Sequence, residues 1–204
     1  MRAPGSTRAP RRATVDDGSV TRIIAGSARG RRLQVPDGGG TRPTSDRARE
    51  GLFSSLLSLT ELDGARVLDL YAGSGALGLE ALSRGAGSAT LVEDDPLALR
   101  ALRSNVHTLG LSGAHVVEGR VEDFLDGHGL TAAPEPRYRL ALLDPPYDVD
   151  VVPVLAALIP WLPTDAVVAV ERATRDPELA WPEGYEATRT RRYGAATLWY
   201  GFRS

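Results

Sequence analysis

The chain has 204 residues, a formal net charge of −2 and no cysteine. This length suits one domain with a substantial core, while the lack of cysteine excludes disulfides, a cysteine nucleophile and zinc–thiolate sites. No apolar run approaches the ~20 residues of a membrane helix and no hydrophobic leader opens the chain, so we expect a cytoplasmic protein without membrane contact.

Every basic residue is arginine, and the arginines are concentrated toward the N-terminus, with eleven arginines against four acids up to Arg49. Residues 1–19 mix Pro, Gly, Ser, Thr and Arg without periodicity, which predicts a disordered basic tail. We expect residues 20–204 to form a single domain, with a hairpin and loop at 20–45 and the main body at 46–204.

Residues 21–36 are expected to form two short strands that turn at 27–30. The arginines of this region are Arg22, Arg29, Arg31, Arg32 and, in the following loop, Arg42. Clustered arginines predict contacts with RNA phosphates, which make binding strongly dependent on salt. A solvated hairpin face is the alternative interpretation.

A helix is expected after this loop, with Thr44 or Ser45 as its cap. Its apolar residues recur at helical spacing: Ala48, Leu52, Phe53, Leu56 and Leu57. Two roles stay open for Arg47 and Arg49 near its start, which are contact with RNA phosphate and bracing of the site through Glu50.

A buried strand, a glycine turn and a helix follow in the segment Val67-Leu-Asp-Leu-Tyr-Ala-Gly-Ser-Gly-Ala-Leu-Gly78. Its glycines match the Gly-x-Gly-x-x-Gly dinucleotide pattern. Glu93 closes the next strand 18 residues after Gly75, where a ribose-binding acid belongs. Taken alone, this pattern predicts NAD.

Asp69 favours a different cofactor. An acid at the end of the first strand would repel the pyrophosphate that a dinucleotide places against the helix N-terminus. The same acid suits S-adenosylmethionine, which carries an ammonium and a sulfonium, while Glu93 can accept hydrogen bonds from the ribose hydroxyls. We therefore predict S-adenosylmethionine, with a turn or helix-capping acid as the alternative role of Asp69.

The hexapeptide Leu142-Leu-Asp-Pro-Pro-Tyr147 predicts chemistry on an exocyclic amine. Such an amine is a poor nucleophile because its lone pair is delocalised into the ring. The carboxylate of Asp144 and the carbonyl of Pro145, fixed by Pro146, are expected to grip its hydrogens and turn the lone pair toward a methyl donor. Tyr147 is expected to stack on the base, a contact worth roughly 1–3 kcal/mol. A plain strand-to-loop turn is the alternative.

Strand and helix signals alternate from residue 66 onward. The expected strands are 66–71, 89–93, 114–118, 139–144, 166–171, 186–192 and 195–202, and the expected helices are 76–84, 96–109, 122–126 and 151–159. This alternation predicts an α/β fold with a doubly wound sheet, closed by an antiparallel pair. Both motif loops follow the carboxyl ends of strands, where such sheets bind ligands.

The segment Asp69–Gly85 and the Asp144–Tyr147 motif together resemble the RsmD family, the bacterial 16S rRNA (guanine 966 N2)-methyltransferases. The N-terminal stretches that agree are Arg22-Ile-Ile-Ala-Gly26, Gly30-Arg-Arg-Leu33, Val35-Pro36 and Thr41–Glu50. The resemblance spans about residues 21 to 200.

This resemblance implies a class I S-adenosylmethionine-dependent methyltransferase, with a Rossmann-like seven-stranded catalytic core and a small N-terminal β-hairpin extension. It further implies that the target is one guanine of 16S rRNA, in the small ribosomal subunit or an assembly intermediate. By position, the cofactor-binding loop consists of Asp69, Tyr71, Ala72, Gly73, Ser74 and Gly75. Glu93 is expected at the ribose, the Val121 backbone beside the adenine, and Asp144 to Tyr147 at the target amine.

Three rival functions are weighed against this one. A DNA or other RNA methyltransferase of adenine N6 or cytosine N4 is disfavoured because the chain has no obvious target-recognition domain beyond the hairpin. Asp69 disfavours an NAD-dependent oxidoreductase, and a noncatalytic RNA-binding module would not need the cofactor loop. No metal is expected, since His107, His115 and His128 have no ligand spacing, and without a coiled coil or repeat we expect a monomer.

Overall fold

The computed structural model describes residues 21–36, 46–127, 138–146 and 148–204. The predictions for the tail 1–19, for Arg42, for the caps Thr44 and Ser45, and for Tyr147 lie outside these residues. In the described part of the chain, no helix is both long and apolar enough to cross a membrane.

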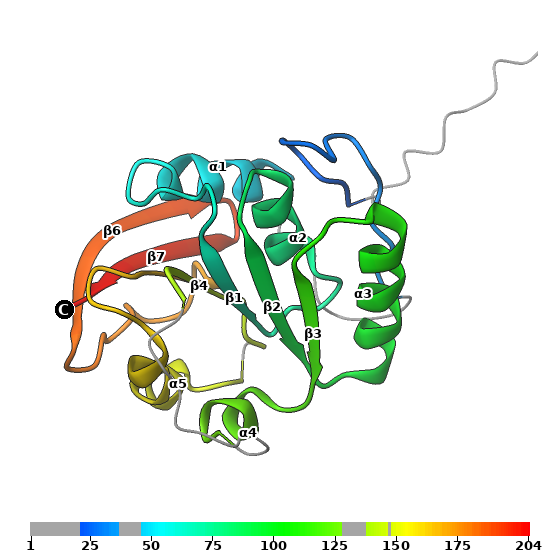
Figure 1. Ribbon diagram of the computed structural model, residues 1–204. Helices are drawn as coiled ribbons and strands as arrows, with labels where there is room; N and C mark the ends of the chain where they lie inside the picture. The colour runs from blue at the N-terminus through cyan, green and yellow to red at the C-terminus, as the bar shows by residue number, and fades with distance from the viewer. Residues whose placement is uncertain (1–20, 37–45, 128–137, 147) are drawn as a thin grey trace, which may run out of the picture.

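The expected seven-stranded α/β sheet is confirmed (Figure 1). The strands are β1 (Arg66–Leu70), β2 (Ser88–Glu93), β3 (Ala114–Glu118), β4 (Leu140–Leu143), β5 (Val167–Ala173), β6 (Tyr185–Tyr193) and β7 (Ala196–Arg203). The helices are α1 (Asp46–Leu56), α2 (Ala76–Ser83), α3 (Pro96–Leu109), α4 (Val121–Leu125) and α5 (Val151–Leu158), with a 3-10 turn at Ile159–Trp161. The predicted bounds agree with these to within about two residues.

The strand order is β3-β2-β1-β4-β5-β7-β6. The first five strands in this order are parallel, whereas β7 runs antiparallel between β5 and β6. The order reverses direction at β1 and β4, because β2 and β3 extend to one side of them and β5 to the other. Open α/β sheets bind ligands at the carboxyl ends of such neighbouring strands.

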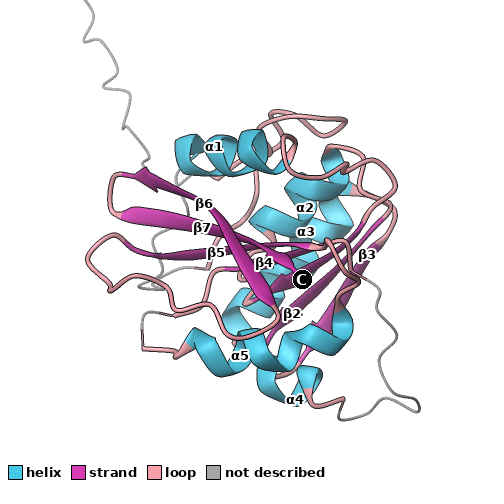
Figure 2. Cartoon of the chain, turned by 90° about the vertical axis from the view of Figure 1, so that its left-hand side faces the viewer, coloured by secondary structure: helices cyan, strands magenta, loops and turns pink. Residues whose placement is uncertain are grey.

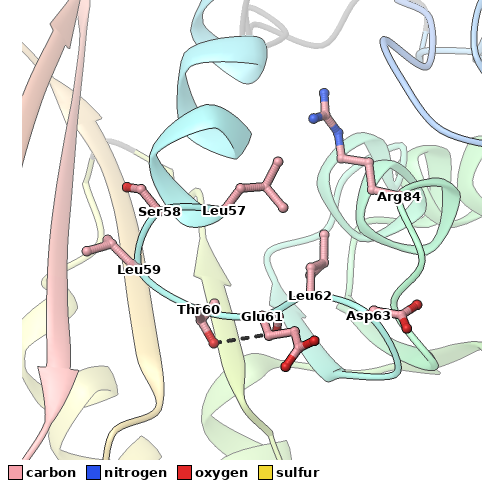
Figure 3. Close-up of a pocket in the computed structure, with 8 residues that line it drawn as sticks. All are labelled: Leu57, Ser58, Leu59, Thr60, Glu61, Leu62, Asp63 and Arg84. Atoms are coloured by element: carbon pink, nitrogen blue, oxygen red, sulfur yellow. Dashed lines mark hydrogen bonds between the residues drawn. The ribbon is translucent and has the colours of Figure 1, made fainter.

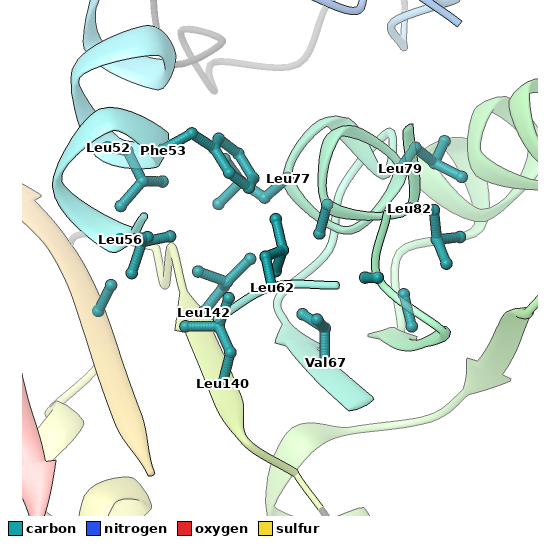
Figure 4. Packing of buried hydrophobic residues seen from close by; sticks show 14 of the residues in the cluster. Leu52, Phe53, Leu56, Leu62, Val67, Leu77, Leu79, Leu82, Leu140 and Leu142 are labelled. Carbon is teal, nitrogen blue, oxygen red and sulfur yellow. The ribbon is translucent and has the colours of Figure 1, made fainter. Parts of the chain in front are cut away.

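Helices cover both faces of the sheet (Figure 2). On one face, α1 packs with α2 and α3, and on the other face α4 packs with α5. Strand β4 contributes to both layers: Leu140 and Leu142 lie in the layer that also contains the apolar side chains of α1 (Figure 4), while Ala141 and Leu143 belong to the opposite layer. This two-sided burial explains why β4 is a continuous apolar run rather than an alternating pattern.

The predicted N-terminal hairpin is present in a short form. The described residues 21–36 contain one antiparallel bridge, between Arg22 and Arg32, and a turn. Backbone hydrogen bonds cross between the two arms, such as the bond from the Ile23 N–H to the Arg31 carbonyl at 2.9 Å. The next two donors along the chain, the N–H groups of Ile24 and Ala25, bond Glu80 of α2 at 2.7 and 3.0 Å, so the hairpin is also docked on that helix.

Candidate active site

The glycine loop between β1 and α2 has a conformation that depends on its residue types. Gly75, at the start of α2, has φ 82°, and a Cβ there would lie 2.5 Å from the Leu102 Cδ1 atom. Gly73 has φ 56° with open space around its missing Cβ. Tyr71 also has a positive φ of 64°, which costs about 1–3 kcal/mol for a residue with a side chain and is concentrated at functional sites.

Asp69 lies beneath this loop and is almost fully buried, with 1% of its surface exposed. Its Oδ2 accepts the backbone N–H of Gly78 at 2.8 Å, while Oδ1 has no hydrogen-bond partner among the described residues. Burial raises the pKa of Asp69 to about 7, with the N–H of Gly78 opposing the rise and the charge of Glu93 adding to it. A buried carboxylate oxygen without a donor fits a cationic ligand group such as an ammonium.

Gly78 allows this close approach of α2 to β1. A Cβ at this position would lie 2.7 Å from Leu91 Cδ2 and 3.0 Å from Asp69 Oδ2. The third glycine of the motif therefore serves helix–strand packing, as its pattern predicts.

Glu93 ends β2 and shapes the same site. Its Oε2 accepts the N–H of Gly73 at 2.7 Å, and its Oε1 accepts those of Asp94 and Asp95 at 3.0 and 2.9 Å. A carboxylate offers about four acceptor positions, so Glu93 retains about one for a ribose hydroxyl. It also fixes Gly73 of the cofactor loop from the neighbouring strand.

The expected adenine side lies at the start of α4. Val121 is the first residue of this helix and is 3% exposed, with its side chain in the core layer of α4 and α5. Only its backbone was expected to meet the adenine, and that role stays a prediction. Nearby, burial raises the pKa of the Tyr71 hydroxyl, and the carboxylates of Glu122 and Asp94 add to this effect.

The Asp-Pro-Pro motif follows β4, which pairs directly with β1, the strand that carries Asp69. Asp69 of β1 is in register with Leu142 of β4, and the Asp144 N–H lies 3.5 Å from the Leu70 carbonyl oxygen. Asp144 is half-buried, Pro145 is buried and Pro146 is exposed. The two motifs therefore meet at the carboxyl ends of adjacent strands, so that a group bound at one loop is next to the other.

Arg172 lies on β5 and contacts the loop that follows β4. The Arg172 Nε lies 3.3 Å from Asp176 Oδ2, so an ion pair is present. The same guanidinium also donates to the Val149 carbonyl at 3.0 Å and contacts the Pro146 carbonyl at 3.5 Å. Arg172 therefore contacts the loop that begins with the Asp-Pro-Pro motif.

The arginines of the N-terminal segment have different surroundings. Arg22 pairs with Asp46 at 3.0 Å but keeps 61% of its side chain exposed. Arg31 donates to the carbonyls of Thr108 and Leu109 at the end of α3, which is a capping contact. Arg29 and Arg32 are exposed, which leaves them accessible to a phosphate.

Arg49 of α1 is fully buried. It donates to the Arg22 carbonyl at 2.6 Å and to Asp46 at 2.9 Å. Its burial removes it from contact with RNA phosphate, and these hydrogen bonds hold the N-terminal segment and Asp46 rather than Glu50. Arg47 is exposed.

Three buried polar residues that sequence reasoning missed join the N-terminal segment to the body. Glu80 accepts two N–H groups of the segment and pairs with Arg84 at 2.7 Å, and Ser83 accepts the Ala28 N–H at 2.9 Å. Asn105 bonds both backbone groups of Gln34 and also donates to the Ser74 carbonyl of the cofactor loop at 2.9 Å. Their sequence signal was a polar residue among the apolar residues on the buried face of a helix.

Figure 3 shows a hollow at a different place, lined by residues 57–63 and Arg84. These residues precede β1 or end α2, so the hollow lies at the amino ends of the parallel strands. None of the predicted site residues lines it.

Comparison with known proteins gives consistent matches. A family model described as "Conserved hypothetical protein 95" matches residues 21–201. "Ribosomal RNA small subunit methyltransferase D" of Escherichia coli K12 is 41% identical over 153 residues, which are 74% of this chain and 73% of that protein. The "Putative rRNA methyltransferase YlbH" of Bacillus subtilis 168 is 38% identical over 166 residues, 79% of this chain and 86% of that protein.

Solved structures match as well. A "Putative methyltransferase yhhF" from Escherichia coli has a TM-score of 0.77 at 36% identity and covers 90% of this chain and 98% of its own. A putative methylase from Haemophilus influenzae has a TM-score of 0.73 at 31% identity, with 90% and 98% covered. The residues matched by the family model include the N-terminal segment, the cofactor loop and nearly all of the sheet.

Proposed function

The chain belongs to the RsmD family of S-adenosylmethionine-dependent ribosomal RNA methyltransferases, and we propose that it methylates the N2 amino group of one guanine in 16S rRNA. The observation that carries this proposal is the meeting of Asp69 and Asp144 at the ends of adjacent strands. One acid is suited to the cationic donor and the other to the amine that receives the methyl group.

S-adenosylmethionine, the predicted cofactor, supplies an electrophilic methyl group on a sulfonium. We assign its ammonium to Asp69, whose Oδ1 lacks a partner among the described residues, and its methionine part to the loop from Tyr71 to Gly75. Glu93 would accept a ribose hydroxyl, and the Val121 backbone would lie beside the adenine. The open space at Gly73 supports this assignment, since backbone is accessible there.

At the target, Asp144 and the Pro145 carbonyl would accept the two hydrogens of the guanine N2 and turn its lone pair toward the methyl group. Tyr147, outside the described residues, is proposed to stack on the base. The amine nitrogen would attack the methyl carbon as the carbon–sulfur bond breaks, so that the neutral thioether leaves in one step with no covalent enzyme intermediate. The proton lost from the amine would pass to Asp144 or to water. Alignment and a carboxylate placed where the amine gains positive charge account for the acceleration.

The substrate is proposed to be 16S rRNA in the small subunit or an assembly intermediate, as the names of several relatives suggest. Arg22, Arg29, Arg32 and Arg42 are the proposed phosphate contacts, with Arg31 shared between RNA and the end of α3. A guanine in an RNA loop is already partly unpaired, so extruding it costs less than the few kcal/mol of a duplex base. We propose a monomer that works in the cytoplasm with its ribosomal substrate.

The test is transfer of tritiated methyl from S-adenosylmethionine to small subunits that lack the family's guanine mark, followed by mapping of the modified base. We expect label at one guanine N2, its loss in Asp144→Ala, and its retention in Asp148→Ala, a control at an exposed acid of the same loop. Label on adenine N6 or cytosine N4 would refute the guanine assignment. Near-normal turnover of Asp144→Ala, with cofactor binding intact, would refute the proposed mechanism.

A further inference from the structure

We propose that Arg172 is a positioning residue for methyl transfer, which holds the target-site loop, described at residues 144–146 and 148–150, in the conformation that presents Asp144 and the Pro145 carbonyl. This inference rests on the proposed function and deepens it. Arg172 acts through the loop rather than on the substrate.

The target-site loop is secured at its two ends by local contacts. At its start, the Asp144 N–H is 3.5 Å from the Leu70 carbonyl, a distance at the long limit of a hydrogen bond. At its end, the Asp150 carboxylate caps α5 by accepting the Val152 N–H at 3.0 Å. The catalytic groups lie near the start of the loop, and a contact in the middle of the loop helps to fix their position.

The guanidinium of Arg172 supplies that contact. It donates to the Val149 carbonyl at 3.0 Å and contacts the Pro146 carbonyl at 3.5 Å. The Val149 N–H in turn donates to Pro146 at 3.1 Å, which closes a tight turn. Arg172 therefore grips both ends of this turn, immediately after the two prolines of the motif.

Arg172 is itself held in place from β5. Its Nε lies 3.3 Å from Asp176 Oδ2, and the two side chains are only 15% and 18% exposed. Leu143 of β4 is in register with Val170 of β5, so the residue two positions further on β5, Arg172, is level with Pro145. Strand β5, an inner strand of the sheet between β4 and β7, thus places Arg172, as a brace, next to the groups it positions.

Arginine suits this role because its planar fork can bond two carbonyls and one carboxylate at the same time. A lysine ammonium is a single point of charge on a flexible stem and cannot reproduce that arrangement. Without Arg172, the Asp144 carboxylate and the Pro145 carbonyl should shift from the positions in which they accept the amine hydrogens. A misplacement of about 1 Å can lower the rate about 100-fold.

The first experiment measures the brace without any substrate, as amide hydrogen exchange at Val149 by NMR. In Arg172→Ala we expect this amide to exchange faster, while amides in the middle of β4 stay protected. The control is Arg139→Ala, at an exposed arginine directly before β4 on the opposite edge of the sheet. Unchanged exchange in Arg172→Ala would overturn the proposal.

The second experiment measures methyl transfer and S-adenosylmethionine binding by the same variants. For Arg172→Ala we expect kcat to fall 10-fold to 100-fold with the cofactor Kd within about twofold of wild type, and millimolar guanidinium to restore part of the rate. Asp176→Asn should lower kcat less, because the bond to Val149 remains. A wild-type kcat, or a loss confined to cofactor affinity, would overturn the positioning role.

Two other results are possible: Arg172→Ala does not fold, or the wild-type protein is inactive on ribosomal substrates. If Arg172→Ala fails to fold, Arg172→Lys takes its place, and a wild-type kcat in that variant would overturn the proposal. If the wild-type protein transfers no methyl group to any ribosomal substrate, the proposed function fails and the positioning role fails with it. The exchange experiment separates that result from a failure of the brace alone, since it needs no substrate.

Discussion

The raised pKa of Asp69 predicts that binding of S-adenosylmethionine weakens as the pH falls below 7. This carboxyl group is fully buried and its pKa is raised to about 7, chiefly by burial. At pH 5 most of it is therefore protonated, and a neutral carboxyl group cannot pair with the cofactor's ammonium. The perturbation to test is a pH series on the wild-type protein and on Asp69→Asn.

The size of the effect follows from the fraction of protein with an ionised Asp69. The apparent Kd equals the intrinsic Kd divided by that fraction. With a pKa of about 7, the apparent Kd should rise roughly 80-fold between pH 7.5 and pH 5. Asp69→Asn should bind weakly throughout and show no such dependence.

Isothermal titration calorimetry between pH 5 and pH 7.5 measures this directly, and this range keeps the ammonium of the cofactor charged. Proton release, read from titrations in two buffers with different ionisation enthalpies, should occur in the wild type below pH 7 and not in Asp69→Asn. A Kd that changes less than threefold over the range would refute the argument. An equal pH dependence in Asp69→Asn would assign the effect to another group.

The same carboxyl group affects stability in the absence of cofactor. In the unfolded chain Asp69 has its ordinary pKa of 3.8, whereas in the folded protein its pKa is raised to about 7. Between these values the folded state binds more protons than the unfolded state, so this group lowers the stability as the pH rises. In thermal unfolding, Asp69→Asn should therefore lose less stability than the wild type as the pH rises toward 7.

Three further variants test the packing around the site, each by urea unfolding. Gly26→Ala should cost more than Gly30→Ala: both glycines have φ +81°, but only at Gly26 would a Cβ lie 1.7 Å from a carbonyl oxygen of α2. The control should cost about 1–2 kcal/mol, and equal losses would contradict the overlap. Glu80→Gln should cost about 3–5 kcal/mol by breaking a buried ion pair, against at most about 1 kcal/mol for the exposed pair broken by Glu118→Gln. Gly78→Ala should lower the free energy of unfolding by about 1–3 kcal/mol and weaken cofactor affinity, because its Cβ would crowd Asp69. Unchanged affinity in calorimetry would contradict this.

The elements that could be predicted from the sequence are those whose signals are local. Helix α3 begins and ends as predicted because Asp95 accepts the N–H groups of Leu97 and Ala98, and because Gly110 takes the left-handed conformation that ends a helix. The central strands were recognisable since strands buried on two faces are short continuous apolar runs. The glycine loop and the Asp-Pro-Pro motif were also recognisable, because each motif consists of residues that are adjacent in the sequence.

The short N-terminal hairpin could be predicted from its turn residues, but its docking on α2 could not. Glu80, about 55 residues further along the chain, accepts two of its backbone N–H groups. Glu80 can bond the N-terminal segment only after α2 has packed on the sheet, so no local sequence pattern predicts this contact.

The sequence by itself therefore determined the doubly wound fold, the two motif loops and the residue types suited to a cationic cofactor and an amine target. The tertiary structure decided which polar groups meet: Asn105 bonds Gln34 and the cofactor loop, and Arg172 bonds the carbonyls of the target-site loop. Hydrogen bonds and burial act over a few ångströms, so their effects on pKa and on loop position depend on which distant segments the packed sheet brings together.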